Sequence, residues 1–264
     1  MENDLSNSVS RALSILECFS PMSPHLTGSE IQKLTNVPRS TVFRLLATLT
    51  ALNYLKQDGE SRKYFLGPRV LSLGFTVLQN QEGRDIARPY LQKLSREFNR
   101  SVNLLMPDKD EMVFIERIRV PGLTDLNIGI GGRIPMYNTG AGRAVLAHMS
   151  PERFREVVEL IKKNRQAARH IGENGEKLKE GLEEVRRLGY ALNDRESDRS
   201  IRAVAVPVFS SGGVSYAAHI VSTPEEVSVE EFKRVYAPRL VEVGREISEA
   251  LGYRDEGRSG QGRR

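Results

Sequence analysis

Hydrophobic residues in the stretch PRSTVFRLLATLTALNYL, residues 38–55, recur at steps of three and four positions. On the 3.6-residue period of an α-helix this spacing gathers them into one stripe. We therefore predict a helix that buries one face in a core. The stripe consists of Val42, Leu45, Leu46, Leu49 and Leu52.

The opposite face of this predicted helix is cationic and aromatic. No Asp or Glu occurs between Pro38 and Lys56. Pro38 suits the first helical position, where a missing N–H group has no consequence, so the free N–H groups of the first turn begin there. The pattern is typical of a recognition helix in the DNA major groove. The candidate DNA contacts on it are Arg39, Ser40, Thr41, Phe43 and Arg44.

The segment before this helix predicts a second, shorter helix over residues 28–35. Thr27 or Ser29 can cap its N-terminus, and Ile31 and Leu34 supply its inward face. A helix, a short turn and a second helix form the motif that places the second helix in the major groove. Thr27 is also a candidate DNA contact.

The segment after the helix predicts a β-hairpin. Residues 54–57 and 63–66 have strand character and flank an Asp-Gly turn. A hairpin in this place is the wing of a winged helix. Arg62 and Lys63 lie near its tip, within reach of phosphate or the minor groove. The alternative interpretation is a small helical core with an ordinary hairpin.

Two further helices complete the N-terminal half. The first, over residues 8–19, has an apolar side made of Val9, Leu13, Leu16 and Phe19, while Arg11 faces away as a candidate contact with the DNA backbone. The other follows Gly67-Pro68 and is apolar on almost all sides. Such a helix needs a partner beyond its own small domain, so we expect it to pack against a second subunit. Its apolar residues are Val70, Leu71, Leu73, Phe75, Val77 and Leu78.

The C-terminal half predicts an α+β domain, because strands occur in two groups with helices between and around them. The first group contains a helix over 84–99, a hairpin of strands 101–106 and 111–117, and extended segments 123–130 and 133–137. Helices over 151–164 and 176–188 separate it from the second group, strands 190–193, 202–209 and 214–221. A final helix is expected over 228–251.

Composition adds only general limits. The chain has 264 residues, enough for two domains, and a formal net charge of +5, which suits a nucleic-acid partner. The single cysteine, Cys18, permits no intramolecular disulfide and reads as a small core residue. No stretch reaches the roughly 18 apolar residues of a membrane span, and the N-terminus lacks a signal pattern. We therefore expect a cytoplasmic protein without a membrane partner.

The sequence carries no recognisable catalytic or cofactor motif. The four histidines are scattered without metal-ligand spacing, and neither a P-loop nor a G-x-S-x-G elbow is present. A carboxylate pair such as Asp194 and Glu196 is more often a solvated loop than an acid/base couple. We expect no enzyme activity, no metal site and no cofactor.

A small-molecule site has better support. The segment NTGAGR, residues 138–143, opens a helix directly after a strand, so unpaired N–H groups of a helix N-terminus face whatever lies before them. Such groups favour a carboxylate or another anion. A plain Gly-rich turn between strand and helix is an equal alternative on these residues alone.

Several runs resemble the IclR family of bacterial transcriptional regulators: SVSRALSILECFS, LTGSEIQKLTNVPRSTVFRLLATLTALNYL and YFLGPRVLSLG, with later matches over nearly the whole chain. The resemblance implies an N-terminal winged helix-turn-helix, a linker helix and a C-terminal GAF-like α+β effector-binding domain. It also implies a dimer or a dimer of dimers on a palindromic operator in double-stranded DNA.

The run YNTGAGRAVLA is similar to the family's effector-binding segment. The resemblance implies that the amides of Gly140 and Ala141 hold the carboxylate of an organic acid. Asn193 stands where several members carry an acidic residue that contacts the ligand. Ala203 and Ile220 stand where members that bind very small acids have polar side chains, so we expect a more apolar pocket and a larger ligand. The implied lining is Leu123, Leu126, Ile201, Ala203, Ile220 and Ser222.

Four segments, LNIGIGGRIPMY, GYALNDRE, IRAVAVPV and IVSTPEEVS, are similar to the branch that includes regulators of protocatechuate and 4-hydroxybenzoate catabolism. The chain departs from that branch at residues 198–201, where it has Asp-Arg-Ser-Ile instead of an apolar residue and a glycine. Arg199, the extra cation, can either pair with a ligand carboxylate or face solvent, and we expect solvent.

These observations predict a DNA-binding domain over 5–67, a linker and dimerisation helix over 68–81, an effector-binding domain over 82–253 and a disordered tail over 254–264. The predicted function is a ligand-responsive transcriptional regulator that controls catabolic genes in response to a small organic, aromatic carboxylate. The alternatives are an architectural DNA-binding protein without a ligand, a regulator that senses a small non-aromatic acid, and a metabolic enzyme with a DNA-binding appendage.

Overall fold

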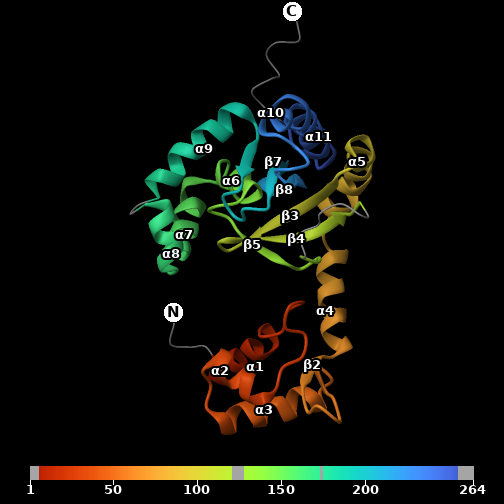
Figure 1. Cartoon of the computed structure of the whole chain (residues 1–264), viewed down its shortest axis with the longest axis vertical. Coiled ribbons are helices and arrows are strands. Elements are labelled where there is room, and N and C mark those ends of the chain that lie inside the picture. Colours follow the sequence, from red (N-terminus) through yellow and green to blue (C-terminus); the bar gives the residue numbers. More distant parts are fainter. Residues whose placement is uncertain (1–5, 121–127, 173–174, 255–264) are drawn as a thin grey trace, which may run out of the picture. The chain divides into compact units, whose positions relative to one another are not determined.

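The structure is a computed structural model that describes residues 6–120, 128–172 and 175–254. The chain divides into two compact units, Met1–Asn80 and Gln81–Arg264, whose elements are labelled in Figure 1.

The first unit is a winged helix-turn-helix. It contains α1 (Asn7–Glu17), α2 (Gly28–Thr35), α3 (Arg39–Ala51), a hairpin of β1 (Leu55–Gln57) and β2 (Tyr64–Leu66), and α4 (Pro68–Gln79). An isolated bridge joins Leu26 to Tyr64 and ties the segment before α2 to the wing. The core of the unit consists of Ile15, Leu26, Ile31, Val37, Val42, Leu46, Leu49 and Leu55.

Four positions expected on the buried sides of these helices are exposed instead. Leu52 follows the last turn of α3, and Leu34 on α2 is 62% exposed. On α1, Val9 and Leu13 are exposed and Ile15 is the buried residue. The predicted stripes are therefore wrong at their ends, because this small core covers only a narrow strip of each helix.

Local capping explains where α2 and α3 begin and end. Thr27 and Glu30 form a reciprocal capping box at the start of α2, and Asn36 ends it in the left-handed conformation with φ 53°. Pro38 is the residue before α3 rather than its first helical residue, so the predicted start is shifted by one position.

The second unit is built on a six-stranded sheet in the order β5-β4-β3-β8-β7-β6, with every neighbouring pair antiparallel. The predicted α+β class is thus confirmed. The strands are β3 (Ser101–Asp108), β4 (Glu111–Ile118), β5 (Arg133–Pro135), β6 (Ala191–Asp194), β7 (Arg202–Ser210) and β8 (Gly213–Ser222).

Helices cover both faces of this sheet (Figure 1). One face packs against α5 (Glu82–Phe98) and α11 (Ala237–Ala250). The other packs against α6 (Gly140–Leu146), with α7 (Pro151–Lys162), α8 (Arg165–Ile171) and α9 (Glu176–Leu188) outside it. The main hydrophobic core lies on the α6 side, where Leu105, Phe114, Ala205 and Ala217 meet α6.

Two helical predictions in this unit are wrong in detail. The sequence pattern predicted a helix that ends at about Asn164 and no helix directly after it. In the structure Asn164 is instead the N-cap of α8, because its side chain accepts hydrogen bonds from the N–H groups of Gln166 and Ala167. The expected final helix is divided into α10 (Val229–Glu231), a π-helix (Phe232–Tyr236) and α11. Pro238, in the first turn of α11, cannot donate a backbone hydrogen bond to the turn before it.

The close approach of α6 to the end of β5 requires a glycine. Thr139 caps the helix by accepting a hydrogen bond from the N–H of Gly142, and its hydroxyl donates to the carbonyl of Pro135 at 2.6 Å. A Cβ atom at Gly142 would lie only 2.2 Å from both the Cα and the carbonyl oxygen of Met136. Because both are backbone atoms, no side-chain movement relieves the clash.

We predict that Gly142→Ala lowers the free energy of unfolding by about 3 kcal/mol, through forced displacement of backbone in a packed core. Gly181→Ala is the matched control. This glycine lies inside α9 with no atom within 4 Å of its would-be Cβ, so alanine there should raise stability by about 0.5–1 kcal/mol. Urea unfolding of the two full-length variants measures both changes, and equal stabilities would contradict the packing argument.

Candidate functional site

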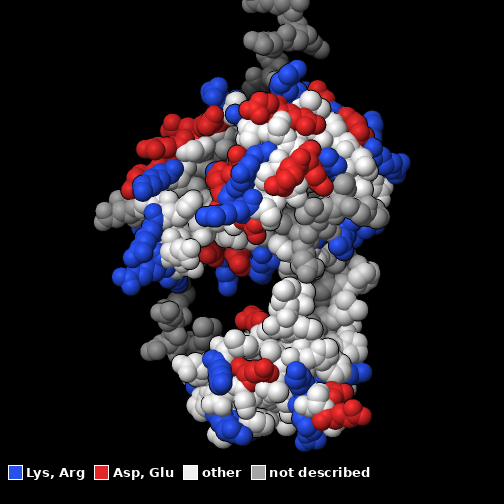
Figure 2. All heavy atoms as spheres, in the orientation of Figure 1, with Lys and Arg blue, Asp and Glu red and all other residues white. Residues whose placement is uncertain are grey.

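Helix α3 presents the predicted DNA-contacting residues. Arg39, Ser40 and Arg44 are exposed, while Thr41 is half-buried. Figure 2 shows Lys and Arg side chains on the unit that carries α3 and the wing. Within the described part of the chain, no carboxylate forms an ion pair with Arg39 or Arg44, so both charges face outward uncompensated.

Phe43 has a structural role besides its exposed position. It is 40% exposed, and its ring lies so close to α2 that a Cβ at Gly28 would be 2.9 Å from it. The Arg39 guanidinium lies over the same ring, 5.2 Å from the centroid. Phe43 therefore packs the first turns of α3 against the start of α2, and its ring makes a cation–π contact with the Arg39 guanidinium.

The hydroxyl of Thr27 is already engaged, because it donates to Glu30 Oε2 at 2.8 Å and accepts from the Glu30 N–H. The Thr27 N–H also donates to Glu30 Oε2, and this bond, together with the one from the hydroxyl, lowers the pKa of the Glu30 carboxyl. Arg11 is half-buried on α1. The predicted DNA contacts of Thr27 and Arg11 remain predictions.

The wing tip carries acids that the sequence interpretation left out of account. Asp58 accepts hydrogen bonds from the N–H and hydroxyl of Ser61, which hold the pKa of its carboxyl below the usual range. With Glu60 next to it, two negative charges accompany Arg62 and Lys63 in this turn. The net charge of the tip is close to zero, so α3 carries the stronger attraction for phosphate.

The second unit contains a cavity of about 330 Å³ at the N-terminal end of α6. It lies on the α6 side of the sheet, next to the β6–β7 connection. Its lining residues are Ile128, Ile134, Pro135, Asn138, Thr139, Gly140, Ala141, Asn193, Ser197, Asp198, Ile201, Ala203, His219 and Val221. Most of them are apolar, and the polar ones gather at distinct points.

One polar point is the start of α6. The N–H groups of Gly140 and Ala141 occupy the first two helical positions, where no carbonyl within the helix can accept from them. Both residues line the cavity. Together with the positive end of the helix, these two donors suit an anionic oxygen.

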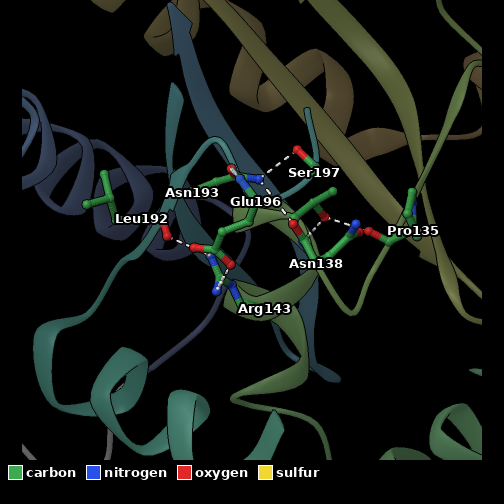
Figure 3. A network of polar contacts seen from close by, with 9 residues as sticks. Pro135, Asn138, Arg143, Leu192, Asn193, Glu196 and Ser197 are labelled. Carbon is green, nitrogen blue, oxygen red and sulfur yellow. Dashed lines mark hydrogen bonds and ion pairs between the residues drawn. The ribbon is translucent and has the colours of Figure 1, made fainter. Parts of the chain in front are cut away.

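Asn193 organises the rim of the cavity. Its Nδ2 donates to the carbonyl of Asn138 at 3.1 Å and to Ser197 Oγ at 2.8 Å, and its Oδ1 accepts from the N–H of Glu196 (Figure 3). These bonds use both amide hydrogens and one lone pair. Asn193 thus holds the β6–β7 connection against the start of α6.

Arg143 on α6 also holds the β6–β7 connection against the start of α6. Its Nη2 donates to the carbonyl of Leu192 at 2.6 Å and to Glu196 Oε1 at 3.0 Å, and Nη1 binds the other Glu196 oxygen (Figure 3). A bidentate guanidinium–carboxylate pair is geometrically specific. It keeps α6 and the β6–β7 connection in a fixed relation.

A second polar point is His219 on β8. The side chain is buried, and burial together with the nearby Arg117 lowers its pKa to about 3, so the ring is neutral at ordinary pH. Its Nε2 has no hydrogen-bond partner in the described part of the protein. The same holds for Asn138 Oδ1 on the rim and for Nδ2 of Asn103, which pairs with His219 across β3 and β8.

Gly140, Ala141, Asn193, Ile201 and Ala203, which the family resemblance implied as effector contacts, all line this cavity, and their contact with a ligand stays a prediction. Leu123 and Leu126 lie outside the described residues. Arg199 is exposed and does not line the cavity, whereas its neighbour Asp198 does.

The expectation that Ile220 and Ser222 line the pocket is wrong by one position. Side chains alternate along a strand, and Ala217 on β8 belongs to the core on the α6 face. His219 and Val221 therefore face the cavity. Ile220 is buried on the opposite face, and the hydroxyl of Ser222 donates to Glu226 Oε2 at 2.7 Å.

Residues that the sequence interpretation missed are Ile128, Ile134, Ser197, Asp198, His219 and Val221. The alternation that places the small Ala217 in the core was the available signal for the last two. Among the described residues, no group of three potential metal ligands occurs, and no helix has the length and apolarity to cross a membrane.

A winged helix-turn-helix followed by an α+β unit with a small-molecule cavity defines a class of DNA-binding regulators. Residues 8–59 match the family model of the IclR helix-turn-helix domain, and residues 75–249 match that of the bacterial transcriptional regulator IclR C-terminal domain. The chain belongs to the IclR family of bacterial transcriptional regulators. Because this family consists of regulators and not of enzymes, the expectation of a regulator is confirmed.

Individual relatives agree with this family. The chain is 31% identical to the Pca regulon regulatory protein of Pseudomonas putida over 250 residues, which cover 94% of this chain and 85% of the relative. It is 32% identical over 227 residues, 86% of each chain, to the HTH-type transcriptional regulator KdgR of Escherichia coli K12. The crystal structure of an IclR family transcriptional regulator from Brucella abortus, 28% identical, matches with a TM-score of 0.81 over 95% of this chain and 94% of that one.

The buried neutral His219 predicts a pH dependence of stability. An unfolded histidine titrates near pH 6.5 and the folded one near 3, so the unfolded chain binds more protons between these values. Stability present above pH 6.5 is lost as the pH falls toward 3.

Between pH 7 and pH 5 this linkage lowers the free energy of unfolding by about 2 kcal/mol. The variant His219→Gln should lack that part of the loss, whereas His170→Gln, which removes an exposed histidine, should keep it. Urea unfolding at the two pH values measures the difference. An unchanged pH dependence in His219→Gln would show that the ring is not held neutral.

Proposed function

We propose that the protein is a ligand-responsive regulator that controls catabolic genes in response to a small aromatic carboxylate. One observation carries the proposal: the cavity has two free amide donors at one end, a neutral hydrogen-bonding histidine elsewhere, and apolar walls between them. This distribution of groups complements a flat apolar molecule with an acid group and a second polar substituent.

Charge orients the ligand in the cavity. The carboxylate binds the N–H groups of Gly140 and Ala141, because the helix N-terminus is the positive point of the lining. Asp198 keeps its negative charge, since hydrogen bonds from Ser200 lower the pKa of its carboxyl, and it repels an anion from its own side. His219 has no charge to attract one.

The second polar group of the ligand meets His219. A neutral imidazole both donates and accepts, so the Nε2 of His219, which has no partner among the described residues, can hydrogen-bond a hydroxyl. Ile134, Ile201 and Val221 supply apolar contacts to the ring between the two ends. A hydroxylated aromatic acid uses all three features, whereas pyruvate or glyoxylate leaves the apolar walls without contact.

The comparisons support the regulator more strongly than the ligand class. The Pca regulon regulatory protein fits the branch of aromatic-acid regulators that four segments of this chain resemble. KdgR, which is equally similar, bears the name of a different regulator. The choice of an aromatic acid therefore rests on the chemistry of the cavity.

On the DNA side we propose a homodimer, or a dimer of dimers, on a palindromic operator. No residue of α4 is buried within the chain, and Leu71 and Phe75 are 73% and 56% exposed. A second copy of α4 would cover this apolar surface. Two-fold symmetry then places two α3 helices in half-sites about one turn of DNA apart.

The response is a shift between two arrangements of the dimer. A ligand shifts such an equilibrium only by binding one arrangement more tightly than the other. The contacts available for this difference are the start of α6 and the β6–β7 connection held by Asn193 and Arg143. Their displacement alters how well both recognition helices fit the operator.

We predict that 4-hydroxybenzoate or protocatechuate, at about a hundred times its dissociation constant, stabilises the protein by about 2.7 kcal/mol. Ala141→Leu should abolish this shift, because its side chain fills the space in front of the two amides, while operator binding survives. Ala250→Leu, at an exposed position of α11, is the control. Thermal unfolding against a panel with pyruvate and glyoxylate measures the effect.

A shift with the small keto acids alone would favour the alternative of a non-aromatic effector. No shift with any acid would favour an architectural DNA-binding protein. A shift retained in Ala141→Leu would move the site away from α6.

For DNA we predict that Arg44→Ala weakens specific binding by about 1–3 kcal/mol, as for a side chain that reads a guanine. Lys63→Ala should weaken operator and random DNA about equally and reduce the salt dependence, because it meets only phosphate. Arg153→Ala, exposed on α7, is the control. Fluorescence anisotropy with an operator selected from random DNA measures all three, and normal operator binding by Arg44→Ala would overturn the assignment of α3.

A further inference from the structure

A second cavity, of about 620 Å³, lies in the same unit where β7 extends beyond its neighbour. Strand β6 pairs only with residues 202–205, so the following residues of β7 have no strand beside them on that edge. The cavity occupies this place. Its lining residues are His148, Gly189, Val206, Pro207, Phe209, Val241, Arg245, Ser248, Glu249, Tyr253 and Arg254.

The walls of this cavity suit a planar apolar group. Val206, Pro207 and Val241 supply aliphatic surface. Phe209 stacks on Tyr253 with ring centroids 4.8 Å apart, and its ring meets that of His148 edge-on at 5.2 Å. Aromatic groups in such offset or edge-on arrangements offer both faces and edges to a further ring.

The polar groups suit an anion. His148 Nε2 is buried and has no hydrogen-bond partner in the described part of the protein, and leaving such an atom unpaired is costly. Burial and the nearby Arg186 lower the pKa of the His148 ring, which favours its neutral form. Two guanidinium groups, Arg245 and Arg254, line the cavity, and among the described lining residues the one carboxylate is that of Glu249, whose nearest oxygen is 3.7 Å from Arg245 Nε.

We propose that this cavity is a second ligand site, which binds a small molecule with a planar apolar body and one anionic group. The body lies against Phe209, Tyr253 and Val241, the anion faces Arg245, and His148 Nε2 hydrogen-bonds a polar atom of the ligand. The site is separate from the first cavity, with which it shares no lining residue.

Helix α6 joins the two sites. Gly140, its first residue, lines the first cavity, and His148 lies just beyond its last residue, Leu146, and lines the second. A seven-residue helix is about 10 Å long. A ligand in the first cavity therefore lies at the start of this short helix, and a ligand in the second lies at His148, two residues past its end.

The probe for a test is 8-anilinonaphthalene-1-sulfonate, whose planar naphthalene ring carries one anionic group and which fluoresces when shielded from water. Val241→Phe fills the second cavity, and Arg245→Gln removes its cation. Ile201→Phe fills the first cavity instead, and Val235→Phe adds the same ring at an exposed position of the π-helix. Arg187→Gln, which removes an exposed arginine with an ion pair of the same 3.7 Å length, is the control for charge.

Fluorescence titration of the full-length proteins should show at least tenfold weaker binding of the probe in Val241→Phe and in Arg245→Gln. Ile201→Phe, Val235→Phe and Arg187→Gln should stay within twofold of the unmodified protein. Glu249→Gln should bind more tightly, because it removes the one competing carboxylate.

Binding in Val241→Phe and Arg245→Gln within twofold of the unmodified protein would overturn the proposal, as would loss of binding in Ile201→Phe. Weaker binding in Glu249→Gln would contradict an anion site. Thermal unfolding of each variant shows whether the fold is retained, and Arg245→Gln, at a largely exposed position, keeps the test valid if Val241→Phe does not fold.

Discussion

The contact between α6 and the backbone at Met136 determines how the ligand cavity is built. Only a glycine at position 142 lets the helix come so near, since a Cβ there would be 2.2 Å from two backbone atoms. With the helix in this position, Thr139 caps one N–H group and leaves those of Gly140 and Ala141 directed at the cavity. The end of the cavity that we propose to bind an anion is thus a consequence of packing.

The polar side chains around this contact are of two kinds, those that hydrogen-bond to other parts of the protein and those with a buried atom that lacks a partner among the described residues. Asn193 and Arg143 use their donors on the β6–β7 connection and the start of α6. His219 and Asn138 keep buried atoms without a partner in the described part of the protein. Groups of the first kind maintain the shape of the cavity, and groups of the second kind are available to a ligand. Asn193 belongs to the first kind.

Sequence reasoning succeeded where one local pattern decides the structure. Helix α9 has the predicted bounds, and the turn residues located the β1–β2, β3–β4 and β7–β8 hairpins, because a strong 3.6-residue or two-residue period acts within one segment. The capped start of α6 at Gly140 was predicted for the same reason, since it is a local feature, whereas the assignment of Gly140 and Ala141 to a ligand came from the family resemblance.

The sequence-based predictions were wrong where contacts between segments far apart in the chain determine the structure. Ile220 and Ser222 were assigned to the pocket by resemblance, but the pairing of β8 with β7 and β3 turns His219 and Val221 toward it. The neutral state of His219 depends on burial beneath α6 and on Arg117 from β4, neither of which a single segment reveals. Likewise, the narrow core of the first unit left Leu34 and Val9 exposed despite their apolar spacing.

The most direct test of the central claim is a crystal structure of the protein with 4-hydroxybenzoate. We expect the carboxylate within hydrogen-bond distance of the N–H groups of Gly140 and Ala141, and the hydroxyl within the same distance of His219 Nε2. A ligand bound with its carboxylate toward His219, or bound outside this cavity, would contradict it.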